Sequence, residues 1–305
     1  MKTLHKKAIS AAAVALLSGL ACSTAFAADT PTDPEDAGNP ISANVTVVND
    51  YRYRGISQSN FKPAIQGGFD YAHESGFYIG NWNSSISWIS DMYSNGGGFV
   101  GKGNTGASVS APIEMDFYAG FKKEFIGEGF ASDLGVLQYY YPTSGIPNTN
   151  GYTANPNTTE IYAAQNFTFG PVTGFAKVSY AVTTLFGTVN STGSVYPDLT
   201  LNYDTGVWGL ALNGHIGYQY VAGGTKNGAS NWLNNGYANG TSNSSLYSYT
   251  DWKLGVTKDF GGGLSGALAY VGTNAATALG AYSYSNPSGK NLGKAGGLIS
   301  LTKTF

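Results

Sequence analysis

Apolar and polar residues alternate with a period of two along most of the chain, from position 43 to the end. In 112–123, for example, apolar side chains at the odd positions alternate with polar or charged side chains at the even positions. A period of two is that of a β-strand, and helical spacing is sustained nowhere. The pattern predicts strands at 43–54, 63–74, 77–89, 112–123, 130–141, 158–168, 171–183, 195–204, 206–220, 247–260, 263–273 and 295–305.

Short and long connections alternate between these predicted strands. The short ones, such as HESG at 73–76 and YDTG at 203–206, each contain glycine, as tight hairpins require. The long ones are rich in Gly, Asn, Ser and Thr, which indicates solvated loops. Turns at one end and loops at the other are typical of an outer-membrane barrel with periplasmic turns and termini. We therefore predict an all-β fold over residues 43–305, an antiparallel up-and-down transmembrane β-barrel of about 12 strands.

The N-terminal region has the features of an export signal. Residues 1–27 contain a basic start, an apolar run and small residues before an expected cleavage site after Ala27. Residues 28–42 are rich in proline and acidic residues, and we expect a flexible periplasmic segment there. The sequence thus predicts export, and the barrel pattern then predicts the bacterial outer membrane as the destination.

The composition suits a protein surrounded by lipid. Only 11% of the residues are charged, where soluble domains carry about 25%, and 22 residues are tyrosine. Beyond the signal there is no run of about 20 apolar residues, so we expect no transmembrane helix. A closed barrel is the other way to satisfy backbone polar groups in hydrocarbon.

Signal cleavage changes the charge balance and the cysteine count. It removes three of the 16 Lys and Arg residues and none of the 18 acidic ones, so 13 − 18 gives a net charge of −5. This sign disfavours nucleic acid as a partner. The only cysteine, Cys22, is lost too, and two histidines remain on separate strands. We predict no cofactor and no metal site, although an acidic loop could still hold calcium.

Aromatic side chains are expected at both membrane interfaces of such a barrel. When the predicted strands are followed up and down, the lipid-facing aromatics separate into two groups. The expected periplasmic group is Tyr78, Phe121, Trp208, Phe260 and Phe305. The expected outer group is Tyr51, Tyr53, Trp88, Tyr139, Tyr141, Tyr218, Tyr220 and Trp252.

Charged side chains in the predicted strands indicate the barrel interior, because a barrel buries charge only where water or a partner meets it. In NDYRYR, at 49–54, three charges alternate with two tyrosines. We expect the charges inside and the tyrosines in the outer lipid interface. The predicted pore-lining set is Asp50, Arg52, Arg54, Asp70, Glu114, Asp116, Lys122, Glu160, His215, Asp251 and Lys253. These charges either set the selectivity of a pore or pair across the lumen and plug it.

Four stretches carry a family resemblance: DYRYRGISQS at 50–59, KPAIQGGFDYAHESGFYIGNW at 62–82, YTDWKLGVTKDF at 249–260 and SLTKTF at 300–305. They resemble the TorF family of porins, also described as the Gcw_chp family of Gram-negative bacteria, over the chain from about position 45 onward, loops excepted. The resemblance implies an outer-membrane barrel that acts as a porin, without naming a substrate. The terminal Phe305 resembles the assembly signal of outer-membrane proteins, which implies the barrel-assembly machinery as a partner.

The function favoured by these observations is a channel for passive diffusion of small hydrophilic solutes or ions through the outer membrane. Twelve strands predict a narrow pore, since eight leave a filled interior and sixteen an open one. A plugged structural or adhesive barrel is the alternative interpretation, and a barrel enzyme such as a phospholipase is a weaker one.

Two short motifs touch on enzyme chemistry. HES, at 73–75, has the His-x-Ser form used by an outer-membrane phospholipase, but it lies in a predicted periplasmic turn. GGGFVGKGNTG, at 96–106, lacks the Ser or Thr that follows the lysine of a phosphate-binding loop. We therefore predict no catalytic residues and no enzymatic activity.

Overall fold

The computed structural model describes residues 40–94, 108–149, 152–224, 240–275, 277–278 and 281–305. Outside the described residues lie the predicted signal peptide, most of the predicted periplasmic segment and the glycine-rich stretch at 96–106.

Twelve strands of the described chain form one closed antiparallel barrel, which confirms the predicted fold. Each predicted strand has its counterpart in the wall. The wall strands are β1 (Ile41–Val48), β4 (Ala64–Ala72), β5 (Phe77–Ser85), β6 (Ile113–Gly127), β7 (Phe130–Tyr140), β10 (Thr158–Phe169), β11 (Val172–Ala181), β12 (Val195–Asp204), β13 (Leu210–Gln219), β14 (Tyr249–Gly261), β15 (Leu264–Thr273) and β18 (Gly296–Thr304).

The barrel closes because the first wall strand lies between the second and the last. Val45 of β1 pairs with Gly67 of β4 on one side and with Lys303 of β18 on the other. At the end of the chain, Phe305 and Ala43 exchange two backbone hydrogen bonds, of 2.8 and 3.3 Å. Every wall strand therefore has two partners, and the wall has no open edge.

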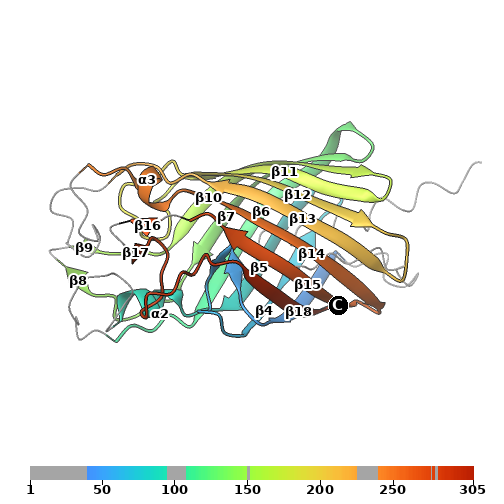
Figure 1. Cartoon of the computed structure of the whole chain (residues 1–305). Helices are drawn as coiled ribbons and strands as arrows, with labels where there is room; N and C mark the ends of the chain where they lie inside the picture. Colours follow the sequence, from blue (N-terminus) through green and yellow to red (C-terminus); the bar gives the residue numbers. More distant parts are fainter. Residues whose placement is uncertain (1–39, 95–107, 150–151, 225–239, 276, 279–280) are drawn as a thin grey trace, which may run out of the picture.

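The two ends of the barrel differ, as Figure 1 shows. The tight turns and the C-terminus lie at one end, which we call the turn end, and the long connections lie at the other, the loop end. No helix in the described part of the chain is long and apolar enough to cross a bilayer. The short elements of the long connections are β2 (Arg52–Tyr53), β3 (Ile56–Ser57), α2 (Trp88–Tyr93), β8 (Asn148–Thr149), β9 (Tyr152–Thr153), α3 (Asn243–Tyr247), β16 (Thr277–Ala278) and β17 (Ala281–Tyr282).

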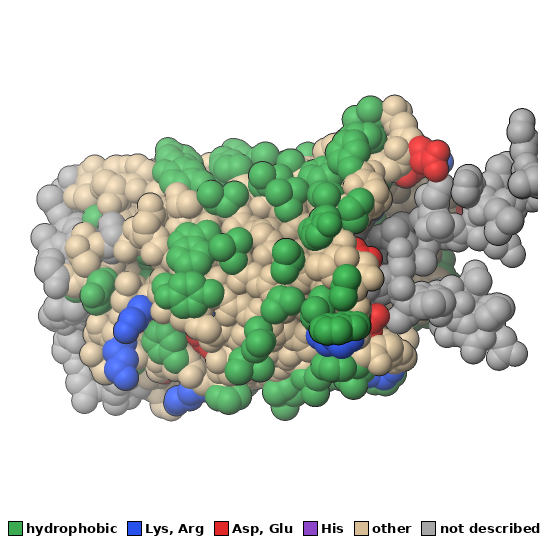
Figure 2. All heavy atoms as spheres, turned by 45° about the vertical axis from the view of Figure 1, so that its right-hand side comes forward, with side chains coloured by type: hydrophobic (Ala, Val, Ile, Leu, Met, Phe, Trp, Pro, Cys, Tyr) green, Lys and Arg blue, Asp and Glu red, His purple; other side chains and the backbone are tan. Residues whose placement is uncertain are grey.

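The wall has an apolar outer face and a polar inner face. In β6, Phe117 is 45% exposed on the outside, whereas the neighbouring Asp116 is 2% exposed. Leu254 in β14 is likewise exposed, and Asp251 and Lys253 are buried. In Figure 2, hydrophobic side chains spread along the wall between the two ends, and charged side chains gather near the ends. Such a surface suits a lipid surrounding.

Several strand boundaries differ from the sequence prediction. β1 begins at Ile41, inside the predicted flexible segment 28–42, and ends at Val48 rather than at position 54. β6 continues to Gly127 through a register shift, so its turn is shorter than predicted. β13 begins at Leu210, after a turn that contains Trp208, so this tryptophan does not lie in the strand.

Tyrosines of the inner face lie flat against glycines of neighbouring strands. A Cβ on Gly80 of β5 would collide with the ring of Tyr118 in β6, and a Cβ on Gly217 of β13 would collide with Tyr196 in β12. The missing side chains therefore make room for rings that lie along the wall. This packing fixes the position of Tyr196, which takes part in the site described below.

Candidate functional site

The segment after β1 folds into the barrel instead of extending the wall. Its strands β2 and β3 pair as a hairpin, with Arg52 opposite Ser57. Arg54 and Gly55 form the two-residue turn with φ of 45° and 76°. Positive φ at both positions is the requirement of a type I′ turn. We call residues 50–59 the lumen hairpin.

A buried ion pair stabilises the base of the lumen hairpin. Arg52 donates from Nε to Asp50 at 2.5 Å, and the hydroxyl of Ser57 donates to the same carboxylate at 2.5 Å. Arg52 also donates to the carbonyl oxygens of Gly55 at 2.9 Å and Lys294 at 3.0 Å. Both members of the pair are almost fully buried. Their charges are thus compensated locally, and the hairpin is tied to the connection before β18.

The tip of the lumen hairpin reaches the opposite wall. Arg54 donates to the two carboxylate oxygens of Glu160 at 2.7 and 3.0 Å and to Gln219 at 2.5 Å. Its guanidinium lies 4.0 Å from the ring centre of Tyr196. Glu160 belongs to β10, which is separated from β1 by four wall strands on one side and six on the other. The hairpin therefore crosses the barrel interior.

The tip combines backbone strain with close packing. The left-handed conformation of Arg54 costs an L-residue about 1–2 kcal/mol, and it persists only where the surroundings fix it. A Cβ on Gly55 would collide with Thr273 and would lie 2.9 Å from the Cβ of Asp251. The two hydrogen bonds to Glu160 and the close packing around Gly55 are the contacts that fix this conformation.

Two further acids lie in the wall beside the hairpin. Glu114 accepts from the hydroxyls of Tyr51 at 2.6 Å and Tyr141 at 2.8 Å. Asp116 is 2% exposed, and its Oδ1 has no hydrogen-bond partner among the described residues. Within the same described part of the chain, neither acid has a Lys, Arg or His nitrogen within 4.0 Å. The interior therefore carries compensated and uncompensated negative charge side by side.

A second cluster surrounds His215 of β13. Its ring nitrogens lie 3.0 Å from Asp198 and 2.8 Å from Asp251, and the hydroxyl of Tyr196 donates to Asp251 at 2.9 Å. Both ring nitrogens can donate to the two carboxylates when the imidazole is protonated. Sequence reasoning omitted Asp198 and Tyr196, although the alternation in β12 places both on the inner face. Tyr196 connects this cluster to the tip of the lumen hairpin.

A third group lies toward the turn end. Asp70 accepts from the hydroxyl of Tyr118 at 2.5 Å, and Asp133 accepts from Tyr78 at 2.6 Å. The Nζ of Lys122 is buried without a hydrogen-bond partner among the described residues. Asp133 was also missed, although alternation along β7 would have placed it inside. The side chains of all the predicted pore-lining residues thus belong to the barrel interior, and their role in a pore stays a proposal.

Six of the predicted interface aromatics were placed on the wrong side, and the structure corrects them. Their rings do not face lipid because they pack inside the barrel or against loop residues. The hydroxyls of buried tyrosines need acceptors, and the interior carboxylates supply them. Trp88 begins α2 instead of ending a strand. Its ring packs edge to face on that of Phe186, with ring centres 6.3 Å apart. The six are Tyr51, Tyr53, Tyr78, Trp88, Tyr139 and Tyr141.

The other predicted interface aromatics point outward. Trp208 is 82% exposed in its turn, and Trp252 packs on the exposed Tyr270 with ring centres 5.5 Å apart. The remaining ones are exposed on the outer wall, and whether they meet a membrane interface stays a prediction. They are Phe121, Tyr218, Tyr220, Phe260 and Phe305.

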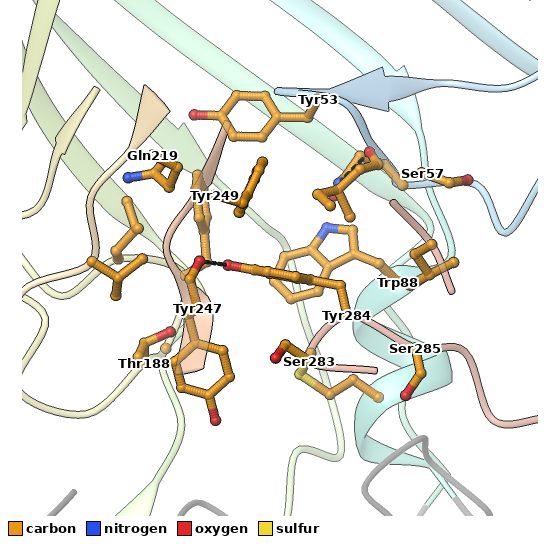
Figure 3. A pocket seen from close by; sticks show the side chains of 18 of the residues that line it. Tyr53, Ser57, Trp88, Thr188, Gln219, Tyr247, Tyr249, Ser283, Tyr284 and Ser285 are labelled. Atoms are coloured by element: carbon orange, nitrogen blue, oxygen red, sulfur yellow. Dashed lines mark hydrogen bonds between the residues drawn. The ribbon is translucent and has the colours of Figure 1, made fainter. Parts of the chain in front are cut away.

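The loop end contains a partly open cavity of about 160 Å³, shown in Figure 3. We call it the aromatic chamber. Part of its wall is the lumen hairpin, through Tyr53 and Gln58, and the rest comes from α2, residues 185–189, α3 and residues 282–285. These connections were predicted to be solvated loops, and their described parts instead pack together through their aromatic side chains. Sequence reasoning missed this site.

One wall of the chamber is fixed by a hydrogen bond between two loops. The hydroxyl of Tyr284 donates to the backbone carbonyl of Tyr247 at 2.7 Å, drawn as a dashed line in Figure 3. Burial raises the pKa of the Tyr284 hydroxyl, so it remains a donor. The ring of Tyr284 also lies 5.2 Å from that of Tyr249, edge to face. The chamber wall is thus built by contacts between distant parts of the sequence.

The His-x-Ser motif lies in an exposed turn between β4 and β5. His73 Nδ1 and the Ser75 hydroxyl are 2.9 Å apart. Within the described residues, no carboxylate lies within 4.0 Å of the imidazole to orient it. A catalytic triad needs such a group, so the contacts are those of a polar turn.

Comparison with solved structures finds porins with low similarity. A structure of the KdgM porin aligns with a TM-score of 0.46 and 6% identity, covering 87% of this chain and 98% of that one. KdgM in complex with disordered oligogalacturonate gives a TM-score of 0.45 at 6% identity, with coverage of 87% and 97%. The outer membrane protein OprD from Pseudomonas aeruginosa gives 0.37 at 11% identity, with coverage of 87% and 65%.

No curated protein matches the sequence. A family model does match, over residues 32–234 and 229–305, and its description is that of a bacterial protein of unknown function. These two segments cover most of the chain, and they include every wall strand. The family therefore supports the Gcw_chp part of the resemblance, and the narrower TorF name has no support beyond it. The chain belongs to the Gcw_chp family of bacterial proteins.

Proposed function

We propose that the protein is an outer-membrane channel through which small hydrophilic solutes or ions diffuse passively. The observation that carries this proposal is a closed barrel whose outer face is apolar and whose interior holds charged side chains from many wall strands. An apolar exterior suits lipid, and a charged interior requires water or partner charges. Together these two surfaces are what an aqueous path across a membrane needs.

The lumen hairpin makes this a narrow channel. It crosses an interior that twelve strands enclose, and its tip contacts β10 and β13. Passage must therefore run beside the hairpin, past Glu114, Asp116 and the Arg54–Glu160 pair. Size and charge at this level set which solutes pass. We expect the channel to exclude anything larger than a small solute.

Assembly in the outer membrane belongs to the same proposal. The chain is exported by the signal peptide, cleaved after Ala27, and the barrel-assembly machinery recognises β18 with its terminal Phe305. Phe305 is 72% exposed on the outside, which leaves its ring available for such recognition. Deletion of Phe305 should reduce the amount of heat-modifiable barrel in outer-membrane fractions. Unchanged assembly of the truncated protein would contradict a role of Phe305 in assembly.

A plugged structural barrel is the second candidate, and one observation favours it. Arg54 is paired with Glu160 across the lumen, as expected if these charges close the interior. In that case the native protein carries no current, and breaking the pair opens a leak. In the channel, the native protein conducts.

Planar-bilayer recording of the purified protein separates these two functions. The channel predicts stable single-channel currents from the native protein and swelling of liposomes in solutions of small sugars or amino acids. A silent native protein that forms correctly folded, heat-modifiable barrels would contradict the proposal.

A further inference from the structure

The exposed charges at the loop end are cationic, although the mature chain is expected to be net negative. The connections at this end span 49–63, 86–112, 141–157, 182–194, 220–248 and 274–295. Besides the ion-paired residues of the lumen hairpin, their sequences contain five lysines and one acid, Asp91. In the described part of these connections, Asp91 is half-buried and three lysines are exposed: Lys62, Lys290 and Lys294. We call these three the loop-end lysine patch.

Two connections that are distant in sequence bring the patch together on one side of the barrel. The side-chain amide of Asn286 donates to that of Asn60 at 2.8 Å and accepts from the backbone N–H of Lys290 at 2.8 Å. Lys62 follows Asn60 by two residues. The carbonyl oxygen of Lys294 accepts from the lumen hairpin at 3.0 Å. The β1–β4 and β15–β18 connections are thus joined where the three lysines lie.

The amino groups of the patch are not neutralised by the protein. Among the described residues, none of the three lysines has a carboxylate oxygen within 4.0 Å. Figure 2 shows Lys and Arg side chains near the loop end, next to hydrophobic side chains of the wall. The patch therefore offers free positive charge to an anion from outside.

The patch lies at the border of the apolar outer wall. Lys62 precedes the start of β4 by two residues, and Lys294 precedes the start of β18 by two. The nearby outward side chains of these strands, Ile65 and Ile299, are 65% and 60% exposed, and Val47 of β1 between them is 52% exposed. An anionic lipid fits such a border, because its headgroup meets the lysines and its acyl chains cover the apolar side chains.

An anionic solute on its way into the lumen is the alternative occupant. Such a solute would next meet Glu114 and Asp116, which have no Lys, Arg or His nitrogen within 4.0 Å in the described part of the chain. Two such acids repel an anion, whereas a lipid headgroup stays outside the barrel. The apolar side chains beside the lysines also have no role for a solute, and they match acyl chains. The surroundings of the patch therefore favour a lipid.

We propose that the loop-end lysine patch binds the phosphate headgroups of anionic lipids in the leaflet at the loop end of the barrel. The acyl chains of these lipids lie on the apolar wall formed there by β4, β1 and β18. The site rests on the membrane location in the proposed function, but it does not require conduction.

Native mass spectrometry of the full-length mature protein in a neutral detergent tests the site. The probes are phosphatidylglycerol and phosphatidylcholine with identical acyl chains, supplied as an equimolar mixture. We expect more adducts with phosphatidylglycerol than with phosphatidylcholine. Lys62→Gln, Lys290→Gln and Lys294→Gln should each lower this preference roughly two- to fivefold, as expected for one cation near an anionic lipid surface. Lys294→Arg keeps the charge and should keep the preference.

Lys123→Gln is the matched control, because Lys123 is equally exposed but lies toward the turn end, where Glu124 follows it directly. Its preference should equal that of the native protein, and every variant must first show heat-modifiable migration. No preference for phosphatidylglycerol in the native protein would overturn the proposal, as would an equal effect of Lys123→Gln. Displacement of the lipid by equimolar inorganic phosphate would also overturn it, since the patch would then be a site for free phosphate.

The site and the channel fail separately in these experiments. A protein that conducts ions and shows no lipid preference would refute the patch alone. A protein that prefers phosphatidylglycerol through these lysines and carries no current would keep the patch and refute the channel.

Discussion

Strand β6 and the lumen hairpin have the same alternation in sequence, but β6 forms part of the barrel wall and the hairpin lies inside the barrel. In β6, Phe117 faces outward and Glu114 faces inward, so the two faces meet two different media. In the hairpin, Tyr51 and Arg52 are both buried inside the protein. A period of two therefore identifies an extended segment, but it does not say that one of the faces meets lipid.

The largest expected effect concerns the contact that holds the hairpin across the lumen. Glu160→Ala leaves the Arg54 guanidinium buried without its carboxylate, which should cost about 3–5 kcal/mol of unfolding free energy. Arg54→Ala combined with Glu160→Ala should recover part of that loss, because no unpaired charge remains. Chemical unfolding of the four proteins of this double-mutant cycle measures the coupling. Additive effects in the cycle would show that the pair does not hold the hairpin.

This double-mutant cycle tests the part of the site that could not be predicted from the sequence. The twelve wall strands were predictable because each keeps its alternation over 8 to 15 residues and ends at glycine-bearing turns or polar loops. The interior position of charges such as Asp251 followed from the same pattern. The path of 50–59 did not, because its partners on β10 and β13 lie more than 100 residues away.

A local signal for the hairpin was nevertheless present. Arg54–Gly55 stands between two short extended pairs, and glycine at the second position suits a type I′ turn. The aromatic chamber had no comparable signal, because its wall combines α2 with residues 185–189 and 282–285. Contacts between distant loops depend on the closed fold, which single-sequence periodicity does not encode.

The second prediction tests the close packing of the hairpin tip. Gly55→Ala adds a methyl group where Thr273 and Asp251 leave no room, at a φ that favours glycine. We expect a loss of about 2–4 kcal/mol from left-handed strain and the clash together, and a larger conductance as the tip withdraws. Gly206→Ala is the matched control, because Gly206 also has positive φ and its Cβ would meet open space. Equal losses at the two positions would mean that the tip is not tightly packed.

The third prediction uses Gly217, which supports the tip indirectly. Gly217→Ala would push the ring of Tyr196 off the wall, and Arg54 lies over that ring. Overpacking of this kind costs typically about 1–3 kcal/mol. Thermal melting should show the loss, and it should shrink in the background of Tyr196→Ala, where no ring needs the space. An equal loss of thermal stability in both backgrounds would show that Gly217 does not support the hairpin through the ring of Tyr196.

The smallest effects are expected on the outer wall. Phe117→Leu keeps an apolar side chain against lipid and should change unfolding free energy by less than about 0.5 kcal/mol.

For side-chain direction, single cysteines at positions 115 and 116 compare the two faces, since the only native cysteine lies in the predicted signal peptide. Position 116 should react with an aqueous thiol reagent and position 115 should not. Equal labelling would contradict the assignment of the two faces.

Excision of the lumen hairpin tests the central claim most directly. Val48 and Ala64 already face each other across β1 and β4, so residues 49–63 can be replaced by a two-residue Asn-Gly turn without altering the wall pairing. Single-channel conductance is then compared between the native and excised proteins in the same lipid and salt. A channel narrowed by the hairpin predicts a small conductance for the native protein and a several-fold larger one after excision. Equal conductances, or a silent native protein, would contradict it.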